Sequence, residues 1–136
     1  MNVVYLTVDH VSELHAEAID QFGGAHGLRS NDLLESAVYQ PQQSAFGEDA
    51  YPSVSSKAAA YAYFLALNHP FLDGNKRTAA AAMLSFLYLN GFHLDRPDKE
   101  IEDAVAELAA KEISKDDFFL WVERALQPEI EDDEDK

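Results

Sequence analysis

Apolar residues recur every three or four positions along most of the chain, which is the spacing of an α-helix with one buried face. The first such segment begins near Asp9 and ends at Gly23 and Gly24, because glycine commonly follows the last turn of a helix. Residues 3–6 form a short apolar run before it that is compatible with an edge strand. The buried face predicted for this first helix carries Val11, Leu14, His15, Ala18 and Phe22.

A second helix is predicted from the capping residue Ser30 to about Gln40. It ends there because Pro41 disfavours the helical conformation in the residue before it. The segment from Pro41 to Ser53 then mixes glycine, proline and polar residues with two aromatic side chains. This composition predicts an exposed loop or flap rather than a further helix.

Two central segments, residues 57–68 and 78–89, are apolar on nearly every face. Such helices lie in the middle of a domain, covered on all sides by others. The sequence shows no internal repeat and no linker. Its 136 residues, 47% of them hydrophobic, are enough for one core without disulfides. We therefore expect one all-α domain over residues 1–126, a compact helical bundle around a buried helix pair.

Two amphipathic helices are predicted to complete the bundle. The first follows Pro97, with acidic residues early and Lys111 late, which is the order that the helix dipole favours. The last begins at the capping residue Ser114 and is halted by Pro128. Residues 127–136 are mostly acidic and contain little apolar surface, so they predict a disordered tail.

The charge of the chain limits its partners. It has 25 acidic residues against 10 lysines and arginines, a net charge of −15, and so repels nucleic-acid backbones and anionic membrane surfaces. It has no cysteine, which excludes disulfides, thiolate metal sites and thiol catalysis. The first residues show neither a basic segment nor a long apolar stretch, so we expect no signal peptide, no membrane anchor and a cytoplasmic location.

The loop between the two apolar helices, residues 69–77, concentrates polar groups that a tight turn does not need. Pro70 and Gly74 account for the turn. Lys76 and Arg77 fall in the first turn of the following helix, where each cation costs about 0.3–1 kcal/mol against the helix dipole. A bound anion would offset that cost.

The same loop suits the transfer of a phosphorus-containing group. Free N–H groups at the start of a helix, a glycine that permits close approach and two cations form a phosphate site. Asp73 offers a hard oxygen ligand suited to Mg²⁺, and His69, a few residues earlier, has the type of side chain that suits a general base near pH 7. The alternative is structural: Asp73 caps the helix, Arg77 pairs with Asp73, and His69 is a core histidine. The combination of all these polar residues in one loop favours the site.

The loop sequence HPFLDGNKR resembles the active-site motif of Fic/Doc proteins, whose common form is H-x-F-x-[DE]-G-N-G-R-x-x-R. Lys76 stands in place of the second glycine and Ala80 in place of the final arginine, and both departures resemble the death-on-curing (Doc) branch, which reads NKRTA. The segments 27–42 and 57–71 resemble that branch too, so the resemblance covers residues 1–126. The matching motif residues are His69, Phe71, Asp73, Gly74, Asn75 and Arg77.

This resemblance implies a role for each residue of the loop. His69 would deprotonate a hydroxyl group on a target protein, Phe71 would anchor the loop in the core, and Asp73 would bind Mg²⁺. ATP is the implied nucleotide. Its phosphates would be held by Gly74, Asn75, Lys76 and Arg77.

The resemblance also implies an activity. Doc proteins with the lysine are toxins that use ATP to phosphorylate elongation factor Tu, which halts translation, and a small Phd-type antitoxin inserts its tail over their site. AMP transfer by the wider Fic family needs the glycine and the arginine that Lys76 and Ala80 replace here. We therefore expect γ-phosphate transfer by a Doc-type toxin. A Fic-type protein AMP-transferase and a non-catalytic binding protein with a degenerate site remain as alternatives.

Some Fic proteins carry an inhibitory motif in the same chain, [ST]-x-x-x-E-[GN]. Its nearest match in this sequence runs from Ser44 to Glu48. Asp49 follows where glycine or asparagine is needed, and Gly47 interrupts any helix. We therefore expect restraint to come from a separate antitoxin.

Overall fold

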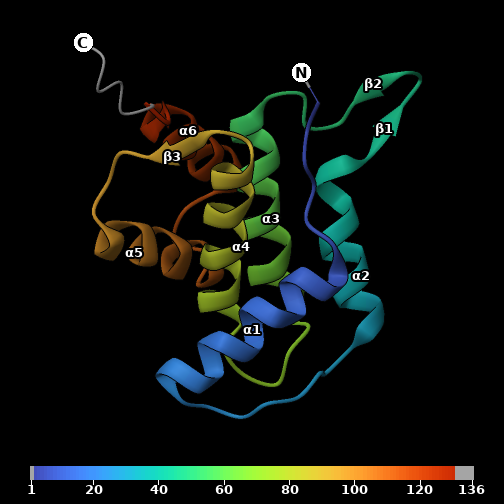
Figure 1. Ribbon diagram of the computed structural model, residues 1–136, viewed down its shortest axis with the longest axis vertical. Helices are drawn as coiled ribbons and strands as arrows, with labels where there is room; N and C mark the ends of the chain where they lie inside the picture. The colour runs from blue at the N-terminus through green and yellow to red at the C-terminus, as the bar shows by residue number, and fades with distance from the viewer. Residues whose placement is uncertain (1, 131–136) are drawn as a thin grey trace.

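A computed structural model describes residues 2–130 of the protein, and this part of the chain is predominantly helical (Figure 1). Its helices are α1 Val8–Phe22, α2 Asn31–Tyr39 with a following 3₁₀ turn Gln40–Gln42, α3 Val54–Asn68, α4 Asn75–Leu89, α5 Asp98–Ala109 and α6 Lys115–Ala125. α3 and α4 lie side by side at the centre, with α1 packed against α4, α2 against α3, and α5 and α6 against the other side of the pair. The expected all-α bundle around a buried helix pair is confirmed.

The central pair is buried because small and apolar residues cover nearly every face of both helices. Most of their alanines are fully buried, and such short side chains let the two helices approach closely. α3 begins at Val54, earlier than expected, because Ser53 and Ser56 form a capping box. No helix among residues 2–130 is both long and apolar enough to cross a membrane.

The segment before α1 is held by side chains instead of by a neighbouring strand. The edge strand considered for residues 3–6 does not form. The Asn90 side chain forms hydrogen bonds with both backbone groups of Val4. Its Oδ1 accepts from the Val4 N–H at 2.8 Å, and its Nδ2 donates to the Val4 carbonyl at 2.9 Å. The Leu6 N–H donates to the hydroxyl of fully buried Tyr61 at 2.9 Å. Burial raises the pKa of this hydroxyl well above its usual range.

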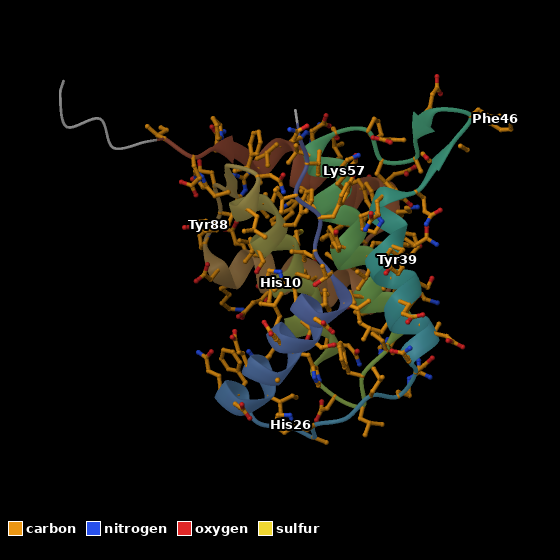
Figure 2. The ribbon with its side chains drawn as sticks, turned by 45° about the vertical axis from the view of Figure 1, so that its right-hand side comes forward. His10, His26, Tyr39, Phe46, Lys57 and Tyr88 are labelled. Carbon is orange, nitrogen blue, oxygen red and sulfur yellow. The ribbon has the colours of Figure 1, made fainter. Side chains whose placement is uncertain are left out.

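The segment expected to be an exposed loop contains a small hairpin, with β1 Ser44–Ala45 and β2 Glu48–Asp49. Phe46 at its tip is fully exposed and points away from the body of the protein (Figure 2). Lys57 of α3 ties the hairpin down, because its nearly buried ammonium donates to Asp49 Oδ2 at 3.1 Å. The exposure was predicted from the sequence, and the strand pairing was not.

A second small sheet joins the end of the described chain to the centre of the fold. β3 Phe92–Leu94 pairs in antiparallel fashion with β4 Leu126–Pro128. The folded part therefore extends past the boundary expected at residue 126, and the disorder expected to begin at residue 127 is wrong for the first two residues of the tail. Residues 131–136 of the predicted tail lie outside the described residues.

Candidate active site

His69 opens the loop between α3 and α4. It follows the last helical residue of α3 and has left-handed backbone angles, with φ 49° and ψ 55°. This conformation costs about 1–2 kcal/mol for a residue with a Cβ atom, so the surroundings must hold it. The side chain is exposed. His69 is therefore not the core histidine of the structural alternative, and a substrate can reach it.

Arg29, in the segment between α1 and α2, caps the end of α3. Its Nε donates to the carbonyl of His69 at 2.6 Å and its Nη2 to that of Asn68 at 2.7 Å. Carbonyls at the end of a helix lack partners within it, and the helix dipole favours a cation there. The backbone N–H groups of Arg29 and Ser30 also donate to the Pro70 carbonyl, at 2.8 and 3.0 Å. The loop is thus held by a segment far earlier in the chain.

Phe71 is buried beneath the loop, with 4% of its surface exposed. The imidazole of His15, from α1, stacks on its ring. The Nε2 of His15 donates to the carbonyl of Asp73 at 2.8 Å. The backbones of Leu28 and Phe71 pair in an isolated antiparallel bridge. Phe71 therefore lies where an anchor is expected, packed against α1 and paired with the segment before α2.

Asn75 holds the loop closed from the start of α4. Its Oδ1 accepts from the Phe71 N–H at 3.0 Å and its Nδ2 donates to the Phe71 carbonyl at 2.9 Å. Both polar atoms of this side chain therefore serve the backbone of the loop, a task that the sequence did not indicate. The backbone N–H of Asn75 lies in the first turn of α4 and can still contribute to phosphate binding.

Asp73 has an exposed carboxylate that also contacts the segment before α2. Its Oδ1 accepts from the Gly74 N–H at 2.9 Å and its Oδ2 from the Ala25 N–H at 3.2 Å. Gly24 permits this approach, because a Cβ atom there would lie 2.7 Å from Asp73 Oδ2. Among the ion pairs of residues 2–130, none joins Arg77 to Asp73, so this part of the structural alternative is not observed.

The donor set at Asp73 fits Mg²⁺. One carboxylate with lone pairs left on both oxygens suits an ion that keeps several waters and is held largely by substrate phosphates. Residues 2–130 contain no group of three His, Cys, Asp or Glu side chains that could hold a metal ion on their own. The Asp73 carboxylate is therefore chemically suited to this ion.

α4 begins at a free, positively charged end. Gly74, with φ 76°, is its N-cap and supplies no side-chain cap. The Thr78 N–H donates to the Gly74 carbonyl at 3.0 Å, so the N–H groups of residues 75–77 have no partner within the helix. Lys76 and Arg77 are exposed, and neither forms an ion pair within the described part of the chain. This arrangement can bind phosphate.

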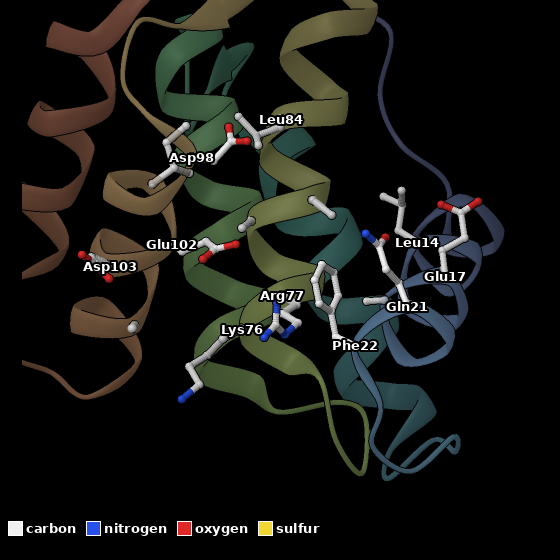
Figure 3. Close-up of a pocket in the computed structure, with 15 residues that line it drawn as sticks. Leu14, Glu17, Gln21, Phe22, Lys76, Arg77, Leu84, Asp98, Glu102 and Asp103 are labelled. Atoms are coloured by element: carbon white, nitrogen blue, oxygen red, sulfur yellow. The ribbon is translucent and has the colours of Figure 1, made fainter.

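A pocket of about 470 Å³ opens beside this helix start, between α1, α4 and α5 (Figure 3). Lys76 and Arg77 line one end of it, and the Arg77 guanidinium lies over the ring of Phe22, 3.9 Å from its centre. Ala80, at the position where the common Fic motif has an arginine, lines it too. The remaining lining is largely apolar. Acidic side chains of α1 and α5 complete it, namely Glu17, Asp98, Glu102 and Asp103.

Two comparisons with known proteins agree with this geometry. The model of the Fic/DOC family matches residues 5–87, which run from before α1 nearly to the end of α4 and include the whole loop. The chain belongs to the Fic/DOC family, as its loop sequence predicted. Over 97 residues it is 44% identical to a protein of Mycolicibacterium smegmatis, a match that covers 70% of this chain and 75% of the relative. That relative is named Toxin Doc, in agreement with the resemblance to the Doc branch.

Arg29 and His15 were not predicted as parts of the site. They contact the loop across 40 and 58 residues of sequence, and local spacing does not show such contacts. Each nevertheless carries a signal in hindsight. A histidine on an otherwise apolar helix face needs a polar partner. A cation directly before the capping residue Ser30 opposes the helix dipole, which indicates a partner elsewhere.

Proposed function

We propose that the protein is a Doc-type toxin of a toxin–antitoxin system that transfers the γ-phosphate of ATP to a hydroxyl group of a protein, with elongation factor Tu as the target. The observation that carries this proposal is the exposed His69 beside the uncapped, cationic start of α4. The name of the relative, Toxin Doc, supports the toxin assignment. Phosphorylation of the elongation factor would halt translation in the cytoplasm.

The residues of the loop divide the reaction among them. His69 takes the proton of the target hydroxyl on a ring nitrogen. The hydroxyl oxygen forms a bond to the γ-phosphorus, the bond from that phosphorus to the β–γ bridging oxygen breaks, and ADP leaves. The N–H groups at the start of α4, with Lys76 and Arg77, stabilise the charge on the transferred group. Asp73 would hold Mg²⁺, which supplies further charge neutralisation when bound.

Two residues favour transfer of the γ-phosphate over transfer of AMP. An AMP-transferase presents the α-phosphorus to the hydroxyl and must grip the β- and γ-phosphates deep in the loop. Ala80 has only a methyl group at the position of the gripping arginine. Lys76 places an ammonium group where the common motif has bare backbone. A reversed nucleotide, with its γ-phosphorus toward His69, is compatible with both residues.

The pocket beside α4 supports restraint by a second protein. Lys76 and Arg77 line this pocket and lie in the first turn of α4, and in this proposal they also hold the phosphates of ATP. A peptide segment that filled the pocket with apolar side chains would cover these two cations and compete with ATP. We assign this role to a small Phd-type antitoxin that acts in trans.

The position of a radioactive label in ATP tests the proposal. Antitoxin-free protein is incubated with elongation factor Tu and with ATP labelled at either the α- or the γ-phosphorus. We expect label in the elongation factor from the γ position alone. Label from the α position would make the protein an AMP-transferase, and label from neither would favour a binding protein. His69→Ala should transfer no label, and Arg124→Ala, on the exposed side of α6, should transfer as much as the parent protein.

A further inference from the structure

The backbone of His69 sets the direction of its Cα–Cβ bond, and so the point from which the imidazole extends. Among the hydrogen bonds of residues 2–130, those at His69 involve its backbone and none involves its imidazole, so no hydrogen bond orients the ring. Its backbone has the left-handed conformation, which is unfavourable for a residue with a Cβ atom, and Pro70 restricts it further. A contact that holds this backbone therefore also holds the base of the side chain, from which the imidazole extends.

Arg29 makes that contact. Its Nε donates to the His69 carbonyl at 2.6 Å and its Nη2 to the Asn68 carbonyl at 2.7 Å. In the described part of the chain no other side chain donates to either carbonyl. We propose that Arg29 is a positioning residue, which fixes the backbone of His69 and thereby aims the base at the acceptor hydroxyl. This inference rests on the proposed function, in which His69 is the general base.

The contact depends on the two parallel N–H donors of a guanidinium group, which lysine lacks. The planar guanidinium presents two N–H groups side by side, and they meet the carbonyls of two successive residues, Asn68 and His69. The fork itself is held in place because the backbone N–H of Arg29 donates to the Pro70 carbonyl at 2.8 Å. A lysine at this position would keep the positive charge, but a single ammonium cannot reproduce the paired geometry.

The phosphate side of the loop is held by other contacts. Asn75 binds both backbone groups of Phe71, and His15 donates to the carbonyl of Asp73. None of these contacts involves Arg29. Loss of Arg29 should therefore disturb the base while the residues that bind ATP stay in place, and this predicts a change in kcat without a change in KM for ATP.

The kinetic test compares γ-phosphate transfer to elongation factor Tu by the parent protein, Arg29→Ala, Arg29→Lys and the control Arg124→Ala. A displacement of about 1 Å in a catalytic group costs on the order of 10²-fold, so we expect kcat to fall by about that factor in both Arg29 variants. KM for ATP should stay unchanged. Guanidinium chloride below denaturing concentrations should restore part of the kcat of Arg29→Ala and leave the control unaffected.

Two kinetic results would overturn the inference. An unchanged kcat in Arg29→Ala would show that the contact does not matter for the base. A higher KM for ATP, together with a lower unfolding temperature and no rescue by guanidinium, would show that Arg29 only stabilises the fold.

A second measurement does not depend on catalysis. Backbone ¹⁵N relaxation gives the order parameter of the His69 amide, which we expect near 0.85 in the parent protein and below about 0.6 in Arg29→Ala. The Asn75 amide should stay ordered in both, and Arg124→Ala should match the parent protein. An equally ordered His69 in Arg29→Ala would overturn the inference. An ordered His69 in a parent protein that transfers no phosphate would contradict the proposed function and leave the contact of Arg29 intact.

Discussion

His15 lies flat against Phe71, with ring centroids 3.8 Å apart and an angle of 5° between the two planes. His15 belongs to α1, and Phe71 belongs to the loop that follows α3. The Nε2 of the same imidazole donates to the Asp73 carbonyl at 2.8 Å. The His15 side chain therefore supports the candidate active-site loop in two ways: the face of its ring stacks on Phe71, and a nitrogen at the edge of the ring forms a hydrogen bond with Asp73.

Replacing His15 should measure this support. His15→Ala should lower the free energy of unfolding by about 2–4 kcal/mol, because it removes a buried ring and a hydrogen bond. His15→Phe keeps the stacked ring and loses the hydrogen bond, so its loss should be about 1 kcal/mol. Urea denaturation of the two variants and the parent protein gives both values. Equal losses in the two variants would show that the stacked ring contributes nothing.

Asn75 offers a test of a structural role against a ligand role. Because its side chain binds both backbone groups of Phe71, Asn75→Ala should lower the free energy of unfolding by about 1–3 kcal/mol. A residue that only bound phosphate would raise KM for ATP and leave the stability unchanged. Thermal unfolding without nucleotide, compared with KM for ATP, separates the two. Lys76→Ala is the matched control, since Lys76 is exposed and should show the ligand pattern alone.

The helices and the chemistry of the loop could be predicted because their signals are local. Ser30 and Ser114 cap α2 and α6 as expected, and the polar residues of the loop are adjacent in the sequence. β3 and β4 could not be predicted, because each has three residues and they are far apart in the chain. Strands of that length show no reliable alternation of apolar and polar residues.

Two further features of the structure were not predicted from the sequence, because in each a distant side chain forms the hydrogen bonds that another backbone segment would otherwise form. The apolar residues 3–6 are compatible with a strand, yet the amide of Asn90 supplies to Val4 the two hydrogen bonds that a neighbouring strand would supply. Arg29 in the same way supplies donors to carbonyls at the end of α3. A pattern of apolar positions does not show which distant polar side chain will serve the backbone, so these contacts require the structure.

Tyr61 gives the fold a dependence on alkaline pH. Burial raises the pKa of its hydroxyl above the usual value of about 10. Above that pH the unfolded chain releases this proton while the folded chain keeps it, so the contribution of Tyr61 to stability is fully present below about pH 10 and is lost as the pH rises further. The stability of the parent protein should therefore fall above about pH 10.

Tyr61→Phe isolates this contribution. At neutral pH its free energy of unfolding should be about 1–3 kcal/mol lower, because the Leu6 N–H loses its acceptor. Above about pH 10 its stability should fall less steeply than that of the parent protein. Urea denaturation at a series of pH values measures both effects. Parallel curves for the two proteins would show that Tyr61 does not carry the alkaline dependence.

The pairing of β3 with β4 predicts how far the chain can be shortened without loss of stability. β4 pairs with β3, and the Glu129 N–H donates to the Gly91 carbonyl at 2.8 Å. A chain that ends at Ile130 keeps these bonds, so its unfolding temperature and its γ-phosphate transfer should match those of the full chain. A chain that ends at Ala125 loses β4 and should lose about 1–3 kcal/mol of unfolding free energy. Equal unfolding temperatures for the two truncated chains would show that β4 adds nothing to stability.

Two substitutions of His69 separate catalysis from backbone conformation. Both His69→Ala and His69→Gly remove the base, and the contribution of a general base is about 10²–10⁴-fold in rate, so both should lose γ-phosphate transfer by such a factor. Their stabilities should differ. Alanine keeps a Cβ atom, which makes the left-handed backbone cost about 1–2 kcal/mol, and glycine adopts that backbone freely.

The gain in stability from alanine to glycine should be smaller than the full cost of the left-handed backbone, because glycine loses more conformational freedom on folding than alanine does. We therefore expect His69→Gly to exceed His69→Ala in free energy of unfolding by about 1 kcal/mol, measured by urea denaturation at one pH. Equal stabilities would mean that the His69 backbone is not left-handed in solution, and the geometry that Arg29 holds would then need revision. Transfer at the parent rate by either variant would exclude His69 as the base, because neither side chain can accept a proton.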